Sequence, residues 1–216
     1  MIKYPEFGEK ISTSSKVTAK LYPKNVKAHR DLIKSTKARC ACCGVPSDPI
    51  KGVESGFLEY IDAETPYLLC VLCRQASNLN RVYNGVKEHG VIIYAPSMDQ
   101  SAIIGITHLY FALGKTDSEY ASKISDLYFS IKKLSEDLSF VTPYSKKMDG
   151  SIEAYREIVD ALPMHISKNQ WHLIKHLRYV PSIPAFQYES TYWSMQLKKR
   201  FNDKWLDKQC ERLESR

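Results

Sequence analysis

Two Cys-x-x-Cys pairs stand 26 residues apart in the chain, and their members are Cys40, Cys43, Cys70 and Cys73. Each pair holds two thiolates at the separation that tetrahedral zinc requires, and two pairs together complete a four-sulfur shell. A closed shell leaves no coordination position for water or substrate. We therefore interpret the pattern as one structural Zn²⁺ ion and not as a catalytic metal. Gly44 supports this interpretation because glycine relieves the steric conflict at a left-handed position in the tight turn after Cys43.

Two further cysteines compete with this assignment. Cys42 lies between the first two proposed ligands, but adjacent Cys42 and Cys43 do not have the spacing of a metal-binding turn. The alternative, in which the four paired cysteines are unrelated buried thiols, is less favoured at this spacing. We predict that Cys42 and Cys210 are ordinary thiols.

The composition is that of an ordinary globular protein, with 44% hydrophobic and 25% charged residues among 216. The first ten residues are charged and lack an apolar core, so no secretory signal is expected. The longest apolar stretch, residues 102–113, is too short to cross a bilayer. Paired cysteines without a secretory signal favour a reducing compartment and zinc over disulfides. We therefore expect a cytoplasmic protein.

The excess positive charge lies before the first cysteine. Residues 1–39 carry ten Lys/Arg and three acidic residues, whereas the rest of the chain carries 21 of each. A basic segment can bind nucleic-acid phosphate, anionic lipid or an acidic protein, and it can equally be a solvated helix face. The candidate contacts are Lys24, Lys27, Arg30 and Lys34.

The apolar pattern predicts an α+β protein in three parts. Residues 1–23 form an N-terminal arm with a short strand, residues 24–96 form the zinc-binding module, and residues 97–216 form a mainly helical region. In the module we expect a basic helix over 24–36, a short hairpin between the cysteine pairs, a strand over 67–69, a helix over 74–83 and a strand over 91–94. In the helical region we expect helices over 99–113, 116–139, 152–162 and 168–177, and a last helix from about residue 190.

Apolar residues recur at steps of four along that last helix; they are Trp193, Leu197, Phe201 and Trp205. The simpler interpretation is a side that faces the core, and the alternative is a partner-binding face. The second predicted helix of this region carries a similar apolar side, formed by Tyr120, Ile124, Leu127, Tyr128, Ile131 and Leu134.

The order of turn, hairpin and helix is typical of the treble clef, a zinc fold that HNH endonucleases share. Endonuclease chemistry of that kind needs a histidine as general base between the cysteine pairs and side chains for a second divalent metal. No histidine lies between Gly44 and Leu69, and Arg74 follows Cys73. We therefore predict a protein that is not an enzyme and has no catalytic residues.

The other histidines are scattered along the chain. His108 falls in an apolar helix, where a core histidine is the simpler interpretation. His172 and His176 are four residues apart and could bind a metal, but no third ligand is near them in the sequence.

Five segments occur in a distinctive order. They are a basic helix leading to C-A-C-C-G, then L-L-C-V-L-C, V-I-I-Y-A-P-S-M, T-H-L-Y-F-A-L and R-Y-V-P-S. Over roughly residues 25–185 this order resembles the IcmJ/DotN family of type IVB secretion and related conjugation systems. The resemblance implies a zinc protein with an HNH-like core that has lost nuclease function, and its zinc ligands would be Cys40, Cys43, Cys70 and Cys73.

The resemblance also implies a role and a partner. Members of the family are cytoplasmic subunits of a coupling complex and bind the C-terminal tail of the coupling ATPase, a membrane-anchored motor. We therefore expect a non-catalytic adaptor that its partner recruits to the inner face of the inner membrane. The alternative is a zinc-stabilised nucleic-acid-binding protein, a degenerate HNH endonuclease, that uses the basic N-terminal region.

Overall fold

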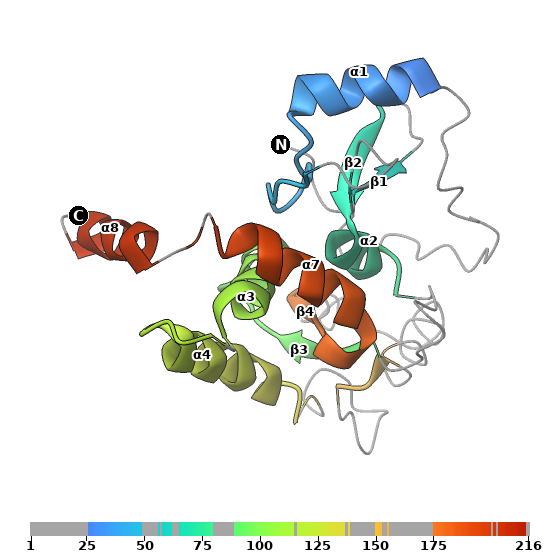
Figure 1. Cartoon of the computed structure of the whole chain (residues 1–216). Helices are drawn as coiled ribbons and strands as arrows, with labels where there is room; N and C mark the ends of the chain where they lie inside the picture. Colours follow the sequence, from blue (N-terminus) through green and yellow to red (C-terminus); the bar gives the residue numbers. More distant parts are fainter. Residues whose placement is uncertain are drawn as a thin grey trace, which may run out of the picture.

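The computed structural model contains helices and two short antiparallel sheets (Figure 1). It describes residues 26–48, 56, 58–61, 65–79, 89–114, 116–136, 138, 150–152, 155, 175–199, 201 and 203–214. The protein is therefore a mixed α+β structure, as the sequence predicts. The arm and strand predicted over residues 1–23 lie outside the described residues.

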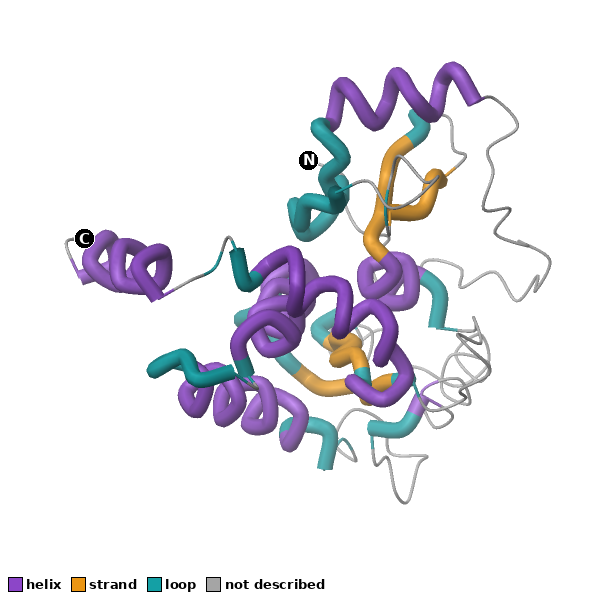
Figure 2. The backbone as a smooth tube through the Cα atoms, viewed as in Figure 1, coloured by secondary structure: helices purple, strands orange, loops and turns teal. Residues whose placement is uncertain are grey.

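Helices and strands follow one another along the chain as Figure 2 shows. They are α1 (Val26–Thr36), β1 (Leu58–Ile61), β2 (Tyr67–Cys70), α2 (Val71–Ser77), β3 (Gly90–Tyr94), α3 (Gln100–Leu113), α4 (Ala121–Lys133), β4 (Leu177–Pro181), the 3₁₀ helix η2 (Ile183–Phe186), α7 (Gln187–Leu197) and α8 (Asp203–Glu214). None of the helices in the described part of the chain is long and apolar enough to span a membrane.

The first sheet is a hairpin that lies beside α1 (Figure 1). Its strands β1 and β2 pair antiparallel, with Leu58 opposite Cys70. The helix α1 packs against β2, and its partly buried Leu32 and Ile33 face the core. The hairpin and the basic helix are thus confirmed on either side of the first cysteine pair.

The second sheet pairs two strands from distant parts of the chain. In it, β3 and β4 run antiparallel, with Ile92 opposite Tyr179. The backbone N–H of Ile92 donates to the Gly150 carbonyl at 2.7 Å. On the other edge, the Gln100 amide accepts the Tyr179 N–H at 2.8 Å and donates to the Tyr179 carbonyl at 2.7 Å. A loop and a side chain therefore satisfy backbone groups that a further strand would otherwise pair.

Replacing Gln100 by leucine tests the side-chain bonds at this edge. Leucine keeps the apolar volume but leaves the backbone N–H and carbonyl of Tyr179 unpaired in a buried place. Because an unsatisfied buried polar group costs about 1–3 kcal/mol, we expect the free energy of unfolding to fall by about 2 kcal/mol or more. Urea denaturation followed by circular dichroism measures it. The exposed Gln187 is the control, and an equal fall in Gln187→Leu would contradict the prediction.

Helix α3 is central to the helical layer, because it packs against α4, α7 and β4. The rings of Tyr110 and Tyr128 stack between α3 and α4, with their centroids 4.5 Å apart. The Tyr128 hydroxyl donates to the Pro181 carbonyl at 2.7 Å, which joins α4 to the end of β4. On α7, Trp193 is fully buried. Aromatic packing therefore holds the three helices and the second sheet together.

The structure confirms β3 and α3 close to their predicted bounds. The strand covers Gly90–Tyr94. The helix begins after Asp99 and ends before Gly114, whose N–H donates to the Tyr110 carbonyl. Asp99 is the N-cap residue of α3 and makes no side-chain hydrogen bond to the helix.

The predicted start of α2 at Arg74 is wrong. The helix begins at Val71, because the Cys70 sulfur caps it by accepting the backbone N–H of Cys73. The second cysteine pair therefore lies at the start of the helix instead of before it.

Helix α4 is shorter than the predicted span 116–139. Residues before it form turns, in which the Thr116 hydroxyl accepts the N–H of Ser118. Its buried residues are Ile124, Tyr128 and Ile131. Leu127 and Leu134, which the pattern assigns to the same side, are each 48% exposed. The predicted apolar side is therefore too wide.

Two predictions in the C-terminal part are wrong. Leu177 begins β4 instead of ending a helix, because it pairs with Tyr94 of β3 in an antiparallel ladder. The single last helix is instead two, α7 and α8, separated at residues 198–202. Most of the helix predicted over 152–162, and residues 168–174 of the next one, lie outside the described residues.

Candidate metal centre

The first cysteine pair lies in a tight turn between α1 and β1. The backbone N–H of Gly44 donates to the Cys40 carbonyl at 3.0 Å, and the N–H of Cys40 donates to the Val45 carbonyl at 2.9 Å. Gly44 has φ of +71°, a left-handed conformation that glycine adopts without steric cost. The expected role of this glycine is therefore confirmed, and the turn directs the sulfurs of Cys40 and Cys43 toward one side.

The second pair joins a strand to a helix. Cys70 ends β2 and caps α2, and Cys73 lies in the first turn of that helix. The backbone N–H of Ala41 donates to the Leu68 carbonyl at 2.8 Å, which joins the first turn to β2. A backbone hydrogen bond between distant positions therefore holds the first turn beside β2, where the second pair begins.

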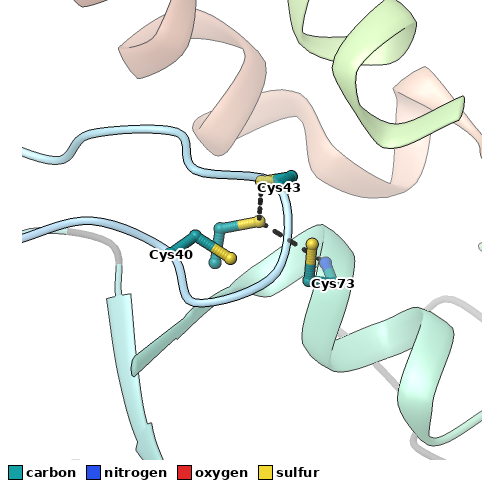
Figure 3. Close-up of side chains that lie close together, drawn as sticks. Cys40, Cys43 and Cys73 are labelled. Carbon is teal, nitrogen blue, oxygen red and sulfur yellow. Dashed lines mark hydrogen bonds between the residues drawn. The ribbon is translucent and has the colours of Figure 1, made fainter. Parts of the chain in front are cut away.

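The four sulfurs converge on one point (Figure 3). All lie within 4.8 Å of one another, and the Sγ atoms of Cys43 and Cys70 are 3.7 Å apart. Zinc–sulfur bonds of about 2.3 Å in a tetrahedron place the sulfurs about 3.8 Å apart, so the four side chains fit a tetrahedral thiolate site. Cys40, Cys70 and Cys73 are buried, and Cys43 is half-buried. Among the described residues, these four make the one such group of ligands.

The protonation of the cluster is uneven. Hydrogen bonding from the Cys43 thiol holds the pKa of Cys40 well below its usual range. Burial raises the pKa of Cys70, and hydrogen bonding with Cys40 raises that of Cys73. One thiolate is therefore stabilised by the neighbouring thiols, whereas four thiolates together need a cation among them.

Two nitrogen atoms outside the ligand group approach the Cys70 sulfur. The backbone N–H of Cys73 donates to it at 3.5 Å. The Nε2 atom of His108, on α3, lies 3.6 Å from the same sulfur. Burial lowers the pKa of His108 to about 4, so the ring is neutral at neutral pH. His108 is a core histidine, as its apolar helix predicts, and it also contacts the candidate ligand.

Helix α7, which is far along the sequence from the cysteines, contacts the residues that follow the first cysteine pair. The Tyr192 hydroxyl lies 3.1 Å from the Ser47 hydroxyl and donates to the Asp48 carbonyl at 3.0 Å. Both residues follow the first cysteine turn. Helix α7 therefore packs directly on the segment that follows the first cysteine pair.

Among the described residues, none of the other predicted site residues belongs to the group of four. Lys27, Arg30 and Lys34 lie exposed on α1, and Lys24 lies outside the described residues. Cys42 is half-buried and outside the group of four, and Cys210 is in α8. His176 lies in a turn before β4, where its ring contacts Tyr94 edge-on, and His172 lies outside the described residues. Because His176 lies in a turn, the structure does not support the helical spacing predicted for His172 and His176.

The contact between His108 and Cys70 is not visible in the sequence. Thirty-eight positions separate the two residues, and no spacing rule connects them. A buried network around His89 was missed for the same reason. Its ring nitrogens lie 2.9 Å from the Gln75 amide nitrogen and 3.0 Å from the Tyr179 hydroxyl. The contacts arise only when His89, directly before β3, lies beside both α2 and β4.

No protein-family model matches the chain, and no curated protein matches it. The assignment of the four cysteines as a metal centre therefore depends on their geometry, their burial and the chemistry of thiolate ligands.

Proposed function

We propose that the protein is a non-catalytic adaptor whose shape is held by one structural Zn²⁺ ion. The observation that carries the proposal is the closed group of four sulfurs, of which three belong to buried residues; a metal held by all four has no position left for a substrate. Within the described residues, no histidine or carboxylate belongs to that group. The ion would hold the first cysteine turn against β2 and α2. We interpret this arrangement of turn, hairpin and helix as a treble clef of the HNH-like type.

The proposed partner is the C-terminal tail of a type IV coupling ATPase. The order of sequence motifs supports this choice, because it resembles the IcmJ/DotN family. Recruitment to the inner face of the inner membrane would follow from that contact, and the exported cargo would be effector proteins or a relaxase–DNA complex. Exposed apolar side chains support a protein partner in general, since Tyr188 and Met195 of α7 are largely exposed.

Binding of the cognate ATPase tail to the full chain tests the adaptor role. We expect a dissociation constant of about 1 µM or tighter, measured by calorimetry, for a specific tail-to-adaptor contact. Tyr188 and Met195 of α7 are 77% and 65% exposed and lie on one helix face, whereas Leu127 of α4 and Leu134, directly after α4, form a second exposed pair. Alanine variants of each pair locate the contact, because only the face that binds should lose affinity. The absence of binding at micromolar concentration would contradict the adaptor role.

Nucleic-acid binding is the second candidate, and the charge of α1 favours it. Lys27, Arg30 and Lys34 are exposed and recur at steps of three and four, so they lie along one side of the helix. Such a row can contact successive phosphates. Asp31 is exposed on the same helix and opposes this attraction.

Salt dependence distinguishes phosphate contacts from a solvated helix face. If α1 binds DNA, changing Lys27, Arg30 and Lys34 to alanine should reduce the slope of log affinity against log salt by about 3. Fluorescence anisotropy of a labelled duplex measures the slope. Changing the exposed Lys133 on α4 is the control and should leave it unchanged. The lack of any binding to DNA at low salt would remove this candidate.

A further inference from the structure

We propose that His108 is a hydrogen-bond donor to the metal centre, and that its imidazole N–H on the Cys70 thiolate helps to retain the ion. This inference rests on the metal binding in the proposed function. It adds a residue of the helical layer, outside the four ligands, that determines how tightly the site holds its metal. The ring would be a positioning and charge-compensating group and not a ligand.

The distances place His108 next to the ligands and outside the ligand group. Its Nε2 atom lies 3.6 Å from the Cys70 sulfur, within the range of an N–H···S hydrogen bond. It is not one of the side chains whose ligand atoms all lie within 4.8 Å of one another. The ring is 2% exposed and the Cys70 side chain is fully buried, so water does not compete for this contact.

The direction of the hydrogen bond follows from the chemistry of a metal-bound cysteine. A thiolate on a metal has no proton to give, so Cys70 accepts and the imidazole donates. The Nδ1 atom of His108 is buried and has no hydrogen-bond partner among the described residues. A proton on Nδ1 would be a buried donor without an acceptor, whereas a proton on Nε2 points at sulfur. The proton therefore lies on Nε2 when the metal is bound.

Apolar packing holds the ring in this orientation. Trp193 of α7 contacts the ring edge-on, with centroids 4.9 Å apart and an interplanar angle of 75°. Phe111 of α3 contacts it at 6.4 Å and 89°. The ring cannot turn without disturbing two large side chains, so the N–H is fixed in place before the metal arrives.

The centre needs such a donor because four thiolates around a divalent ion leave an excess of negative charge. The buried Cys70 sulfur lacks water to disperse that charge and has two N–H groups instead, from Cys73 and His108. Groups that hydrogen-bond to metal ligands typically change metal affinity by about 10–100-fold when they are removed. All four ligands lie between residues 40 and 73. The N–H group of His108 on α3 therefore comes from outside the segment that carries the ligands.

The test uses the full chain loaded with Co²⁺, which binds tetrahedral thiolate sites and reports on them by absorption. His108→Phe keeps an aromatic ring against Trp193 but removes the N–H, and His108→Gln can place an amide N–H near the position of Nε2. Tyr128→Phe is the control, because it removes a buried hydrogen bond of α4 far along the chain from the ligands. Zn²⁺ affinity is measured for each variant by competition with a chromophoric chelator.

We expect His108→Phe to bind Zn²⁺ about 10-fold or more weakly than wild type. Its sulfur-to-Co²⁺ charge-transfer band should move to longer wavelength, because a thiolate without the hydrogen bond gives up its electron more easily. His108→Gln should recover most of both properties, and Tyr128→Phe should match wild type in both.

Wild-type affinity and spectrum in His108→Phe would overturn the inference while leaving metal binding intact. The same weakening in His108→Phe and His108→Gln with an unshifted band would also overturn it, since that result reports packing alone. Failure of the wild-type chain to bind Co²⁺ or Zn²⁺ would overturn the proposed metal centre together with this inference.

Discussion

The variant Cys70→Ser is expected to lose its metal ion and to unfold around the two cysteine pairs. The Cys70 sulfur is fully buried, contacts Cys43 and His108, and caps α2. Structural zinc sites supply about 10–16 kcal/mol of apparent binding free energy in small zinc peptides, and that energy stabilises the fold. We expect the metal content to fall from one ion per chain to none, with a large loss of thermal stability. Elemental analysis and thermal denaturation measure both, and excess chelator on the wild type should have the same effect.

The variant Cys42→Ser provides the matched control. It changes a thiol two positions from Cys40 that lies outside the group of four. It should retain one ion per chain and a melting temperature close to that of the wild type. Loss of the ion in Cys42→Ser, with its retention in Cys70→Ser, would show that the assignment of ligands is wrong.

Replacing Trp193 by alanine should cost about 3–5 kcal/mol of unfolding free energy, the range for large buried aromatic side chains. Trp193 is fully buried on α7 and packs against His108 and Tyr192. The cavity would lie between α7 and α3 and could not close without moving both helices. Urea denaturation followed by far-ultraviolet circular dichroism measures the loss without relying on tryptophan fluorescence.

Trp205 is the natural comparison, because the sequence pattern places it in the same apolar row. Its side chain is 36% exposed on α8 and contacts Phe201 with ring centroids 4.7 Å apart. We expect Trp205→Ala to cost about 1 kcal/mol or less, as partly exposed side chains lose little burial. Equal losses in the two variants would contradict the division of this row into a buried and an exposed half.

The grouping of the four cysteines could be predicted because the geometry of each pair is local. A Cys-x-x-Cys turn places two sulfurs together whatever lies around it, and Gly44 identifies the left-handed position of the first turn. The hairpin between the pairs and the strand β3 could also be predicted, since each depends on short apolar runs bounded by turn residues. In these segments neighbouring residues determine the structure.

The parts that the sequence did not predict depend on contacts between distant segments. From the sequence alone, Leu177 is assigned to the end of a helix, because its strand conformation depends on pairing with β3. The separation of α7 from α8 places Trp193 against α3 and leaves Trp205 on the surface, although the apolar spacing continues across the break. The approach of His108 to Cys70 likewise requires α3 to pack on α2. Periodicity describes one element at a time and carries no information on such packing.

The pairing of β3 with β4 also bears on the order in which the chain can fold as it is synthesised. The cysteine ligands are complete once residue 73 has emerged, so the ion can bind early, from local contacts alone. The strand that carries Ile92 and Ile93 must wait until Tyr179 has emerged, because β4 is its pairing partner. During that interval an apolar strand has a bare edge, and such edges pair readily with other chains. If the four cysteines bind zinc as proposed, we expect a nascent or truncated chain that ends before Pro181 to hold the ion and yet to aggregate, because β3 then lacks its partner strand β4.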